Sequence, residues 1–209
     1  MSTKNIEVEL RGPLNETEYQ QLKAFLQEQG ALVKIQNRFL LDFSTFLEGI
    51  GERKLDVRAR VTNGKVELIV KKGKFGGTSR EEASIFPSDT LEGTLKFMSL
   101  LGYSKAVACD RGIERYKVGD IEVAIQDVRN FSQPGTIHSR FFEAEIMADV
   151  ATEKAATEQI RDFLKKQGLR EFSENEWNEY VAKMNNEANG VFNCLEDDIA
   201  LVADLGKQP

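Results

Sequence analysis

The chain has 209 residues, 41% of them hydrophobic and 30% charged, and its formal net charge is −6 at pH 7. These values are typical of a soluble globular protein with one large domain and a core of its own. They exclude an outer surface built for the nucleic-acid backbone, which requires a basic face. No apolar run reaches the length of a membrane span or of a signal peptide's hydrophobic region. We therefore expect neither a nucleic-acid partner nor a membrane.

The few cysteines and the single histidine argue against several kinds of metal and catalytic site. Cys109 and Cys194 lack the CxxC spacing of a zinc site, and two cysteines do not make a disulfide framework. The single histidine, His138, argues against a histidine metal site or a catalytic triad. We expect a protein of the reducing cytoplasm, in which any bound polyanion meets a local concentration of Lys and Arg.

The first predicted strand, Ile6 to Arg11, alternates apolar and charged residues. Because successive side chains of a strand point to opposite faces, Glu7, Glu9 and Arg11 share one face and the apolar residues share the other. Gly12-Pro13 is expected to end the strand. Taken alone, the charged face is that of an ordinary surface strand, so its meaning depends on whether other strands repeat it.

A helix and a second extended stretch follow. Asn15 and Glu18 form a capping box, which predicts a helix that Gly30 ends. Residues 31–43 are apolar and extended, and we expect them to hold a strand and a turn.

The clearest hairpin runs from Val57 to Lys71 around Asn63-Gly64, because both central positions of the favoured two-residue turn need positive φ. Folding the strands about that turn pairs Arg60 with Glu67 and leaves one wholly apolar face. The opposite face is largely basic, since it carries Arg58, Arg60 and Lys71. This separation is sharper than solubility requires.

The next strand, Ser79 to Ile85, places Arg80 and Glu82 on one face. Ser88 or Asp89 is expected to cap a second helix.

A second hairpin is predicted at Gly119-Asp120. Counting outward from this turn puts Arg111 and Arg115 on the same face as Gln126, opposite an apolar face. Residues 128–140 are polar and contain Pro134-Gly135, so we expect a long connection with His138 in an exposed loop.

The final predicted strand, Phe141 to Ala148, puts Glu143 and Glu145 on one face. Beyond residue 150 the sequence favours helices over residues 152–167 and 174–185, with a short acidic helix over 195–205.

Six or more strands thus share one design, apolar on one face and charged on the other. In an open sheet the charges are only the solvated side. If the strands instead close into a barrel, the charges line an interior that needs water, ions or a charged ligand. Clustered Arg and Lys suit phosphate oxygens, whereas carboxylates without His or Cys suit Mg²⁺ or Mn²⁺. Both together indicate a metal-chelated polyphosphate.

With these residues in place, the chain resembles the CYTH superfamily of triphosphate tunnel metalloenzymes, which includes class IV adenylate cyclases, thiamine triphosphatases and inorganic triphosphatases. The family's E-x-E-x-K signature resembles Glu7, Glu9 and Arg11, with Arg in place of Lys. The other family motifs resemble, in order, Arg58 and Arg60, Lys71, Arg80 and Glu82, Arg111 to Arg115, and Glu143 and Glu145.

The resemblance implies an α+β fold, an eight-stranded antiparallel β-barrel that forms a tunnel, with helices packed outside and a helical C-terminus. It covers residues 1–209 as a single domain, with the barrel strands within 1–150 and the C-terminal helices in 151–209. It implies catalytic roles for Glu7, Glu9 and Arg11, substrate binding by Arg58, Arg60, Lys71, Arg80, Arg111 and Arg115, and Mg²⁺ or Mn²⁺ binding by Glu7, Glu9, Glu82, Glu143 and Glu145.

Two departures from the family pattern bear on activity. Arg11 keeps the charge of the signature lysine but not its geometry. Gln126 falls on the tunnel side at a position where the family usually has a carboxylate, while the adjacent Asp127 points away unless a bulge re-aims the strand.

Three hypotheses for function follow. The first is a divalent-metal-dependent hydrolase of triphosphates such as tripolyphosphate, ATP or thiamine triphosphate. The second is a class IV adenylate cyclase that makes cyclic AMP from ATP. The third, motivated by Arg11 and Gln126, is a non-catalytic protein that binds triphosphate or nucleotide. A homodimer is an additional expectation, because apolar barrel exteriors must be covered.

Overall fold

The computed structural model describes residues 6–44, 55–73, 81–86, 90–197 and 202. Nine strands and four helices lie in these ranges. In chain order they are β1 (Ile6–Leu14), α1 (Glu16–Gln29), β2 (Ala31–Asp42), β3 (Leu55–Thr62), β4 (Lys65–Lys72), β5 (Glu81–Ile85), α2 (Leu91–Leu100), β6 (Lys105–Val118), β7 (Ile121–Arg129), β8 (Ile137–Ala148), α3 (Glu153–Lys166), α4 (Glu174–Glu187) and β9 (Gly190–Asn193).

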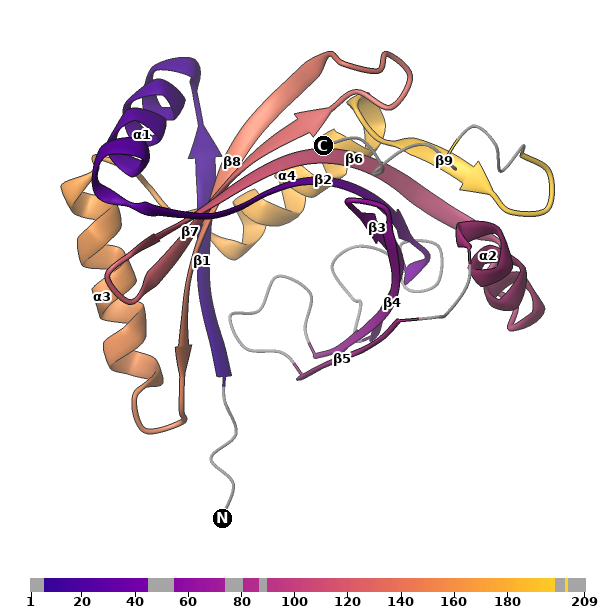
Figure 1. Cartoon of the computed structure of the whole chain (residues 1–209), viewed down its shortest axis with the longest axis horizontal. Coiled ribbons are helices and arrows are strands. Elements are labelled where there is room, and N and C mark those ends of the chain that lie inside the picture. Colours follow the sequence, from indigo (N-terminus) through magenta and orange to yellow (C-terminus); the bar gives the residue numbers. More distant parts are fainter. Residues whose placement is uncertain (1–5, 45–54, 74–80, 87–89, 198–201, 203–209) are drawn as a thin grey trace.

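All the strands belong to one antiparallel sheet in the order β1-β8-β7-β6-β2-β3-β4-β5, with β9 paired to β6. The sheet curls through β2, β3, β4 and β5 (Figure 1). Among the described residues, no hydrogen-bonded ladder joins β5 back to β1, so the barrel is open along this seam. The predicted α+β class, with an antiparallel sheet rolled into a tunnel, is confirmed, and β9 is a ninth strand that the sequence did not indicate.

Both predicted hairpins form with the predicted register. Around the first turn, Arg60 pairs with Glu67 and Val61 with Val66. The turn residue Asn63 has φ of 46°, and Gly64 has φ of 80°, which is the positive φ that this turn requires. Because a shift of one residue would exchange the two faces, this register is what sends the arginines of β3 inward and its valines outward.

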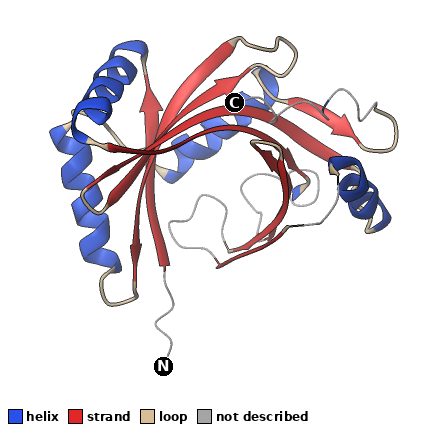
Figure 2. Cartoon of the chain, in the orientation of Figure 1, coloured by secondary structure: helices blue, strands red, loops and turns tan. Residues whose placement is uncertain are grey.

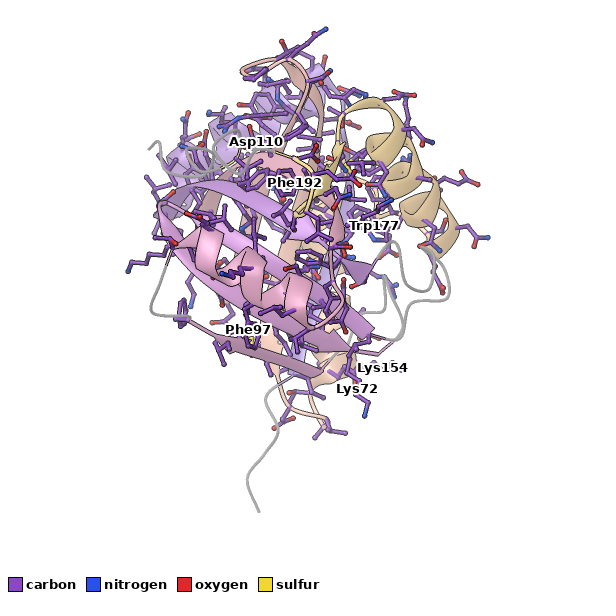
Figure 3. The ribbon with its side chains drawn as sticks, turned by 90° about the vertical axis from the view of Figure 1, so that its right-hand side faces the viewer. Lys72, Phe97, Asp110, Lys154, Trp177 and Phe192 are labelled. Carbon is purple, nitrogen blue, oxygen red and sulfur yellow. The ribbon has the colours of Figure 1, made fainter. Side chains whose placement is uncertain are left out.

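Three helices cover the outer, apolar face of the sheet. The α1 and α3 helices pack on β1, β6, β7 and β8, where Leu26 and Ile160 are fully buried. As predicted, Asn15 caps α1 and forms a capping box with Glu18. The α2 helix packs against β2 and β3 through Leu95. Figures 2 and 3 show this helix on the outer side of the curled part of the sheet. Within the described chain, none of the helices has the length and apolar character needed to cross a membrane.

The α4 helix lies on the other face. Its residues Trp177, Val181 and Met184 pack with Val128 and Phe141, which belong to the charged side of β7 and β8. This helix belongs to the helical C-terminus that the resemblance implied, and it covers part of the inner face of the sheet.

Gly12-Pro13 does not end the first strand, because β1 continues to Leu14 and Pro13 pairs with Phe141. Among the described strands β1 pairs only with β8, and proline is tolerated on such an edge because its missing N–H can face away from the partner. Residues 31–42 likewise form one strand without the expected turn, although its register shifts between Leu32 and Lys34.

The prediction of a long connection over residues 128–140 is wrong. Strands β7 and β8 extend into this segment and leave only residues 130–136 between them. His138 therefore lies in β8 and is half-buried, with its Nε2 atom 2.9 Å from a carboxylate oxygen of Glu187. The prediction that His138 lies in an exposed loop is therefore wrong.

Two expected features fall largely outside the described residues. Thr90 caps α2 through a hydrogen bond from the backbone N–H of Gly93, and the expected caps Ser88 and Asp89 are not described. Of the short helix expected over 195–205, only residues 195–197 and Val202 are described, and the first three form a turn and bend.

Candidate functional site

The inner face of the sheet, together with α4, encloses a cavity of about 490 Å³ that is lined by residues from all eight strands β1 to β8. We call this cavity the tunnel. Arg80 lies outside the described residues. Every other site residue predicted from the sequence lines the tunnel: Glu7, Glu9, Arg11, Arg58, Arg60, Lys71, Glu82, Arg111, Arg115, Glu143 and Glu145. The structure thus brings these residues together, and their individual roles stay predictions.

The sequence interpretation missed several tunnel residues. The β2 strand contributes Lys34, Arg38 and Asp42, α4 contributes Trp177, and Asn189 follows that helix. The alternation of Lys34 and Arg38 along one strand was the available signal, but the expected turn in this stretch concealed it. No spacing rule indicates that a face of α4 enters the tunnel.

Charge is segregated around the tunnel. The acidic wall comes from β1, β7 and β8 and consists of Glu7, Glu9, Glu122, Glu143 and Glu145. The basic wall comes from β2, β3 and β6 and consists of Lys34, Arg38, Arg58, Arg60, Arg111 and Arg115. Four charged residues fall outside this division. Arg11 lies on β1 and Asp42 on β2, and Lys71 on β4 pairs with Glu82 on β5 beside the two walls.

The acidic wall holds protons that a bound cation could displace. Burial, with repulsion from Glu143, raises the pKa of Glu9 to about 7, although Arg11 opposes the shift. Burial likewise raises the pKa of Glu145 to about 8 against the attraction of Arg115. Burial also acts on Glu143, but Arg11 and Arg115 outweigh it, so the pKa of Glu143 is lowered. The pKa is thus raised at Glu9 and lowered at Glu143, and the two side chains share a hydrogen bond.

Most cations of the tunnel are paired with carboxylates. Arg58 donates to Asp56 through Nε at 3.1 Å and through Nη2 at 2.6 Å, and Asp56 is completely buried. Arg115 lies 2.9 Å from Glu122 and 3.4 Å from Glu145, measured from Nη1 to the carboxylate oxygens.

Two further ion pairs have their carboxylates on β4 and β5. Arg60 donates to Glu67, and Lys71 Nζ lies 2.5 Å from Glu82 Oε2. These pairs neutralise cations that would otherwise repel one another in a partly buried space.

Gln126 joins the two walls without adding charge. Its side chain is 3% exposed, donates from Nε2 to Glu143 and accepts from Arg111 Nη1 at 3.5 Å. Asp127 points to the outer face, where it pairs with Arg140 at 2.7 Å. The parity prediction for Gln126 therefore holds, and this position of the tunnel carries an amide in place of a carboxylate.

Arg11 links β1 to α4. Its guanidinium donates to Glu9 and lies 4.6 Å from the centroid of the Trp177 ring, a cation–π contact. The backbone N–H of Phe172 donates to the carbonyl of Arg11 at 2.8 Å. The signature residue thus positions the helix that covers this part of the tunnel.

The donor set of the acidic wall is chemically suited to a hard cation. Among the described residues, no three His, Cys, Asp or Glu side chains are gathered as a ready-made metal site. Glu9 and Glu143 nonetheless share a hydrogen bond, so two carboxylates meet at one point. Magnesium in proteins is commonly held by one or two carboxylates plus substrate phosphates and waters. The residues therefore fit a cation whose remaining ligands come from the phosphate that it accompanies.

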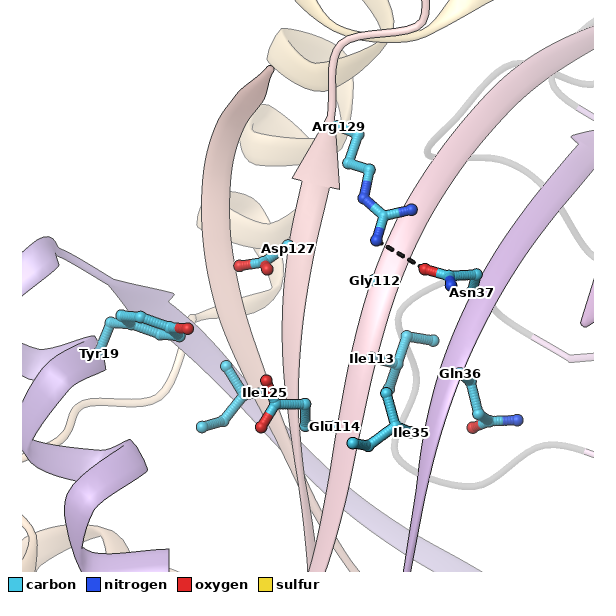
Figure 4. A pocket seen from close by; sticks show the side chains of 10 residues that line it. All are labelled: Tyr19, Ile35, Gln36, Asn37, Gly112, Ile113, Glu114, Ile125, Asp127 and Arg129. Carbon is cyan, nitrogen blue, oxygen red and sulfur yellow. Dashed lines mark hydrogen bonds between the residues drawn. The ribbon is translucent and has the colours of Figure 1, made fainter. Parts of the chain in front are cut away.

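A second, smaller pocket of about 80 Å³ opens on the outer face near Tyr19 (Figure 4). Within it, Arg129 Nη2 donates to Asn37 Oδ1 at 2.6 Å and passes over Gly112. A Cβ atom on Gly112 would lie only 2.7 Å from Arg129 Nη2, so glycine is what lets this clamp between β2 and β7 cross β6. This pocket is too small for a triphosphate, and we assign it a structural role.

No family model matches the sequence, and no curated protein matches it. Solved structures do match. The PH1819 protein of Pyrococcus horikoshii OT3 superposes with a TM-score of 0.67 at 18% identity, covering 85% of this chain and 98% of that one.

Two other structures carry functional descriptions. A Vibrio parahaemolyticus protein described as a candidate adenylate cyclase has a TM-score of 0.61 at 15% identity and covers 85% of this chain and 98% of its own. The Hippeastrum protein HpAC1, a candidate adenylyl cyclase described as having a dominant triphosphatase activity, has a TM-score of 0.54 at 18% identity and covers 81% and 91%. This chain therefore shares the fold of these solved structures, in agreement with the fold that the resemblance implied.

Proposed function

We propose that the protein is a divalent-metal-dependent hydrolase of inorganic or organic triphosphates. The observation that carries this proposal is the segregation of charge in one enclosed space, with five carboxylates on the acidic wall and six cations on the basic wall. A magnesium triphosphate has matching parts, because its phosphate oxygens seek guanidinium groups and its cation seeks carboxylates. The triphosphatase activity described for HpAC1, which shares the fold, is consistent with it.

The basic wall would bind the phosphate chain. Arginine presents paired N–H groups that match two phosphate oxygens, so Arg58, Arg60 and Arg115 can exchange their carboxylate partners for the substrate. Lys71 and Arg111 would complete the contacts. Phosphoryl transfer depends mainly on such positioning and on neutralisation of charge at the transferring group.

The acidic wall would hold the cation. We propose Mg²⁺ or Mn²⁺ at Glu9 and Glu143, with Glu7, Glu145 and Glu82 as further candidate ligands. When bound, the ion would supply positive charge to the phosphoryl oxygens as a Lewis acid. Glu7 and Glu9 would orient the attacking water, and Arg11 would add a fixed positive charge from the same strand.

An adenylate cyclase is the second candidate, favoured by the description of the Vibrio parahaemolyticus structure. The same tunnel could hold ATP so that its ribose 3′-hydroxyl attacks the α-phosphorus. That reaction forms cyclic AMP, with pyrophosphate as the leaving group. Water attack on the terminal phosphorus forms phosphate instead, so the two products separate the candidates.

A non-catalytic triphosphate-binding protein is the third candidate, favoured by the neutral amide of Gln126 beside Glu143. It predicts calorimetric binding of a triphosphate without any product.

We further propose a cytoplasmic location, since Cys109 and Cys194 are both free thiols. A homodimer is proposed as well, because Leu100 on α2 is 79% exposed.

One activity screen tests these candidates. Tripolyphosphate, ATP and thiamine triphosphate are each incubated with Mg²⁺ or Mn²⁺, and both phosphate and cyclic AMP are measured. We expect phosphate release that chelator abolishes and that Glu9→Gln lowers at least about a hundredfold, as loss of one positioned electrostatic group typically does. The matched control is Glu158→Gln, an exposed carboxylate of α3, which should retain full activity. No turnover of any substrate with either metal would contradict the hydrolase.

A further inference from the structure

Arg38 occupies the centre of the basic wall, on a strand where no motif assigns a functional residue. It lines the tunnel from β2 and pairs in register with Arg111 of β6. Like charges directly opposite one another on a sheet destabilise it. Repulsion also comes from neighbouring strands, since burial and then Arg60, Arg115 and Arg111 lower the pKa of Arg38 to about 9, although the attraction of Glu143 opposes this shift. At neutral pH the guanidinium remains charged.

Arg38 and Arg111 differ from the other tunnel arginines in their partners. Across the described residues, Arg38 forms no hydrogen bond or ion pair, and its Nε is buried without a partner. Within the described part of the chain Arg111 forms no ion pair: it contacts the amide of Gln126 at 3.5 Å, the Cys109 thiol and the Phe141 ring, whose centroid lies 5.2 Å away. Glu143 attracts it only from beyond ion-pair distance. By contrast, Arg58, Arg60 and Arg115 each have a carboxylate partner.

Arg38 and Arg111 are both half-buried, and neither is ion-paired with a carboxylate of the described residues. Two facing guanidinium groups in this state repel each other, and an anion bound between them relieves the repulsion. Because neither group must first release a carboxylate, an anion can bind between them without breaking an ion pair. The acidic wall is not required for this contact, so no divalent cation is needed either.

We propose that Arg38 and Arg111 form an anion anchor that binds one phosphoryl group of a polyphosphate in the absence of metal. This inference deepens the proposed function, because it assigns a phosphate position within the same tunnel to a residue outside the recognised motifs. A cation at the acidic wall then strengthens the binding of a polyphosphate that Arg38 and Arg111 already hold.

The test is calorimetric titration of sodium tripolyphosphate into the metal-free protein in chelator. We expect binding by the wild type, and a dissociation constant at least about tenfold higher for Arg38→Leu, as loss of a charge-assisted hydrogen bond predicts. Arg38→Lys keeps the charge and should recover part of the affinity. The control Arg161→Leu removes an exposed arginine of α3 and should bind as the wild type does.

A thermal melt without ligand separates binding from a merely structural role. If Arg38 is an anchor, Arg38→Leu relieves repulsion and melts at the same temperature as the wild type or higher. A structural arginine would instead lower the melting temperature. Should Arg38→Leu fail to fold, Arg38→Gln is titrated in its place.

Unchanged affinity in the Arg38 variants, or no metal-free binding by the wild type, overturns the anchor. Neither result affects the hydrolase, which is judged by phosphate release with Mg²⁺ or Mn²⁺. Conversely, metal-free binding that depends on Arg38 without any turnover supports the anchor and contradicts the hydrolase.

Discussion

Gln126 shows how one side chain sets the charge balance of the tunnel. Its amide donates to Glu143 and accepts from Arg111, so it bridges the acidic and basic walls while adding no charge. A carboxylate there would repel Glu143 and attract Arg111 in the metal-free protein, and it would offer a bound cation another oxygen ligand.

We therefore predict that Gln126→Glu acts mainly when metal is present. Without metal, repulsion from Glu143 and attraction by Arg111 oppose each other, so the melting temperature should change by less than about 3 °C, which corresponds to roughly 1 kcal/mol for a chain of this size. With Mn²⁺, the stabilisation on adding metal should exceed that of the wild type. Melting curves in chelator and in Mn²⁺ measure both effects. Gln133→Glu, in the exposed loop between β7 and β8, is the control and should change neither. Equal metal-induced shifts in Gln126→Glu and wild type would argue against a cation beside Glu143.

The raised pKa values of Glu145 and Glu9 predict how stability depends on pH in the metal-free protein. Their ordinary value is 4.5, and in the folded chain they are about 8 and about 7. A carboxyl whose pKa is raised by folding stabilises the fold while it is protonated, and this contribution is lost as pH rises through the folded value. We expect the melting temperature in chelator to fall between about pH 5 and pH 8.

The variant Glu145→Gln isolates this effect, because glutamine does not titrate. Its melting temperature should fall less over the same pH interval. Identical pH profiles for variant and wild type would show that Glu145 titrates normally in the folded protein.

At the scale of elements, α4 is the one described helix that packs on the inner face of the sheet. It brings Trp177, the single tryptophan of the sequence, into the tunnel wall beside Arg11. Its capping box, formed by Ser173 and Glu176, fixes where this helix begins.

Trp177 should therefore report on occupancy of the tunnel. A triphosphate that draws Arg11 away from Glu9 also changes the cation–π contact with Trp177. We predict a saturable change in intrinsic fluorescence on adding tripolyphosphate with Mg²⁺, with the same midpoint as calorimetric binding. The Trp177→Phe variant should abolish the signal and still bind. Binding without any fluorescence change would place the ligand away from Arg11.

At the scale of the whole molecule, the sequence predicts what depends on strand parity. Alternation placed Glu7, Glu9, Glu143 and Glu145 on one face, and the Asn63-Gly64 turn fixed the register that carries Arg58 and Arg60 inward. Even Gln126 was assigned correctly to the tunnel, because no bulge interrupts β7 before Val128.

Other features depend on contacts between distant segments. The β9 strand has only four residues, and it exists because they pair with β6. Pro13 can continue a strand because β1 lies at an edge of the described sheet. The α4 helix covers the inner face because Phe141 and Val128 offer it an apolar surface. The alternation of residues within one segment cannot predict these contacts. The role that we propose for Arg38 could not be predicted either, because it depends on arginines of the neighbouring strands β3 and β6.

The most direct test of the central claim is calorimetric binding of tripolyphosphate to variants of each wall, with and without Mn²⁺. Arg111→Gln alters the basic wall, and Glu143→Gln alters the acidic wall. We predict that Arg111→Gln weakens binding at least about tenfold under both conditions, whereas Glu143→Gln weakens it only when Mn²⁺ is present. Wild-type affinity in both variants under both conditions would contradict a tunnel in which cations and carboxylates share one metal triphosphate.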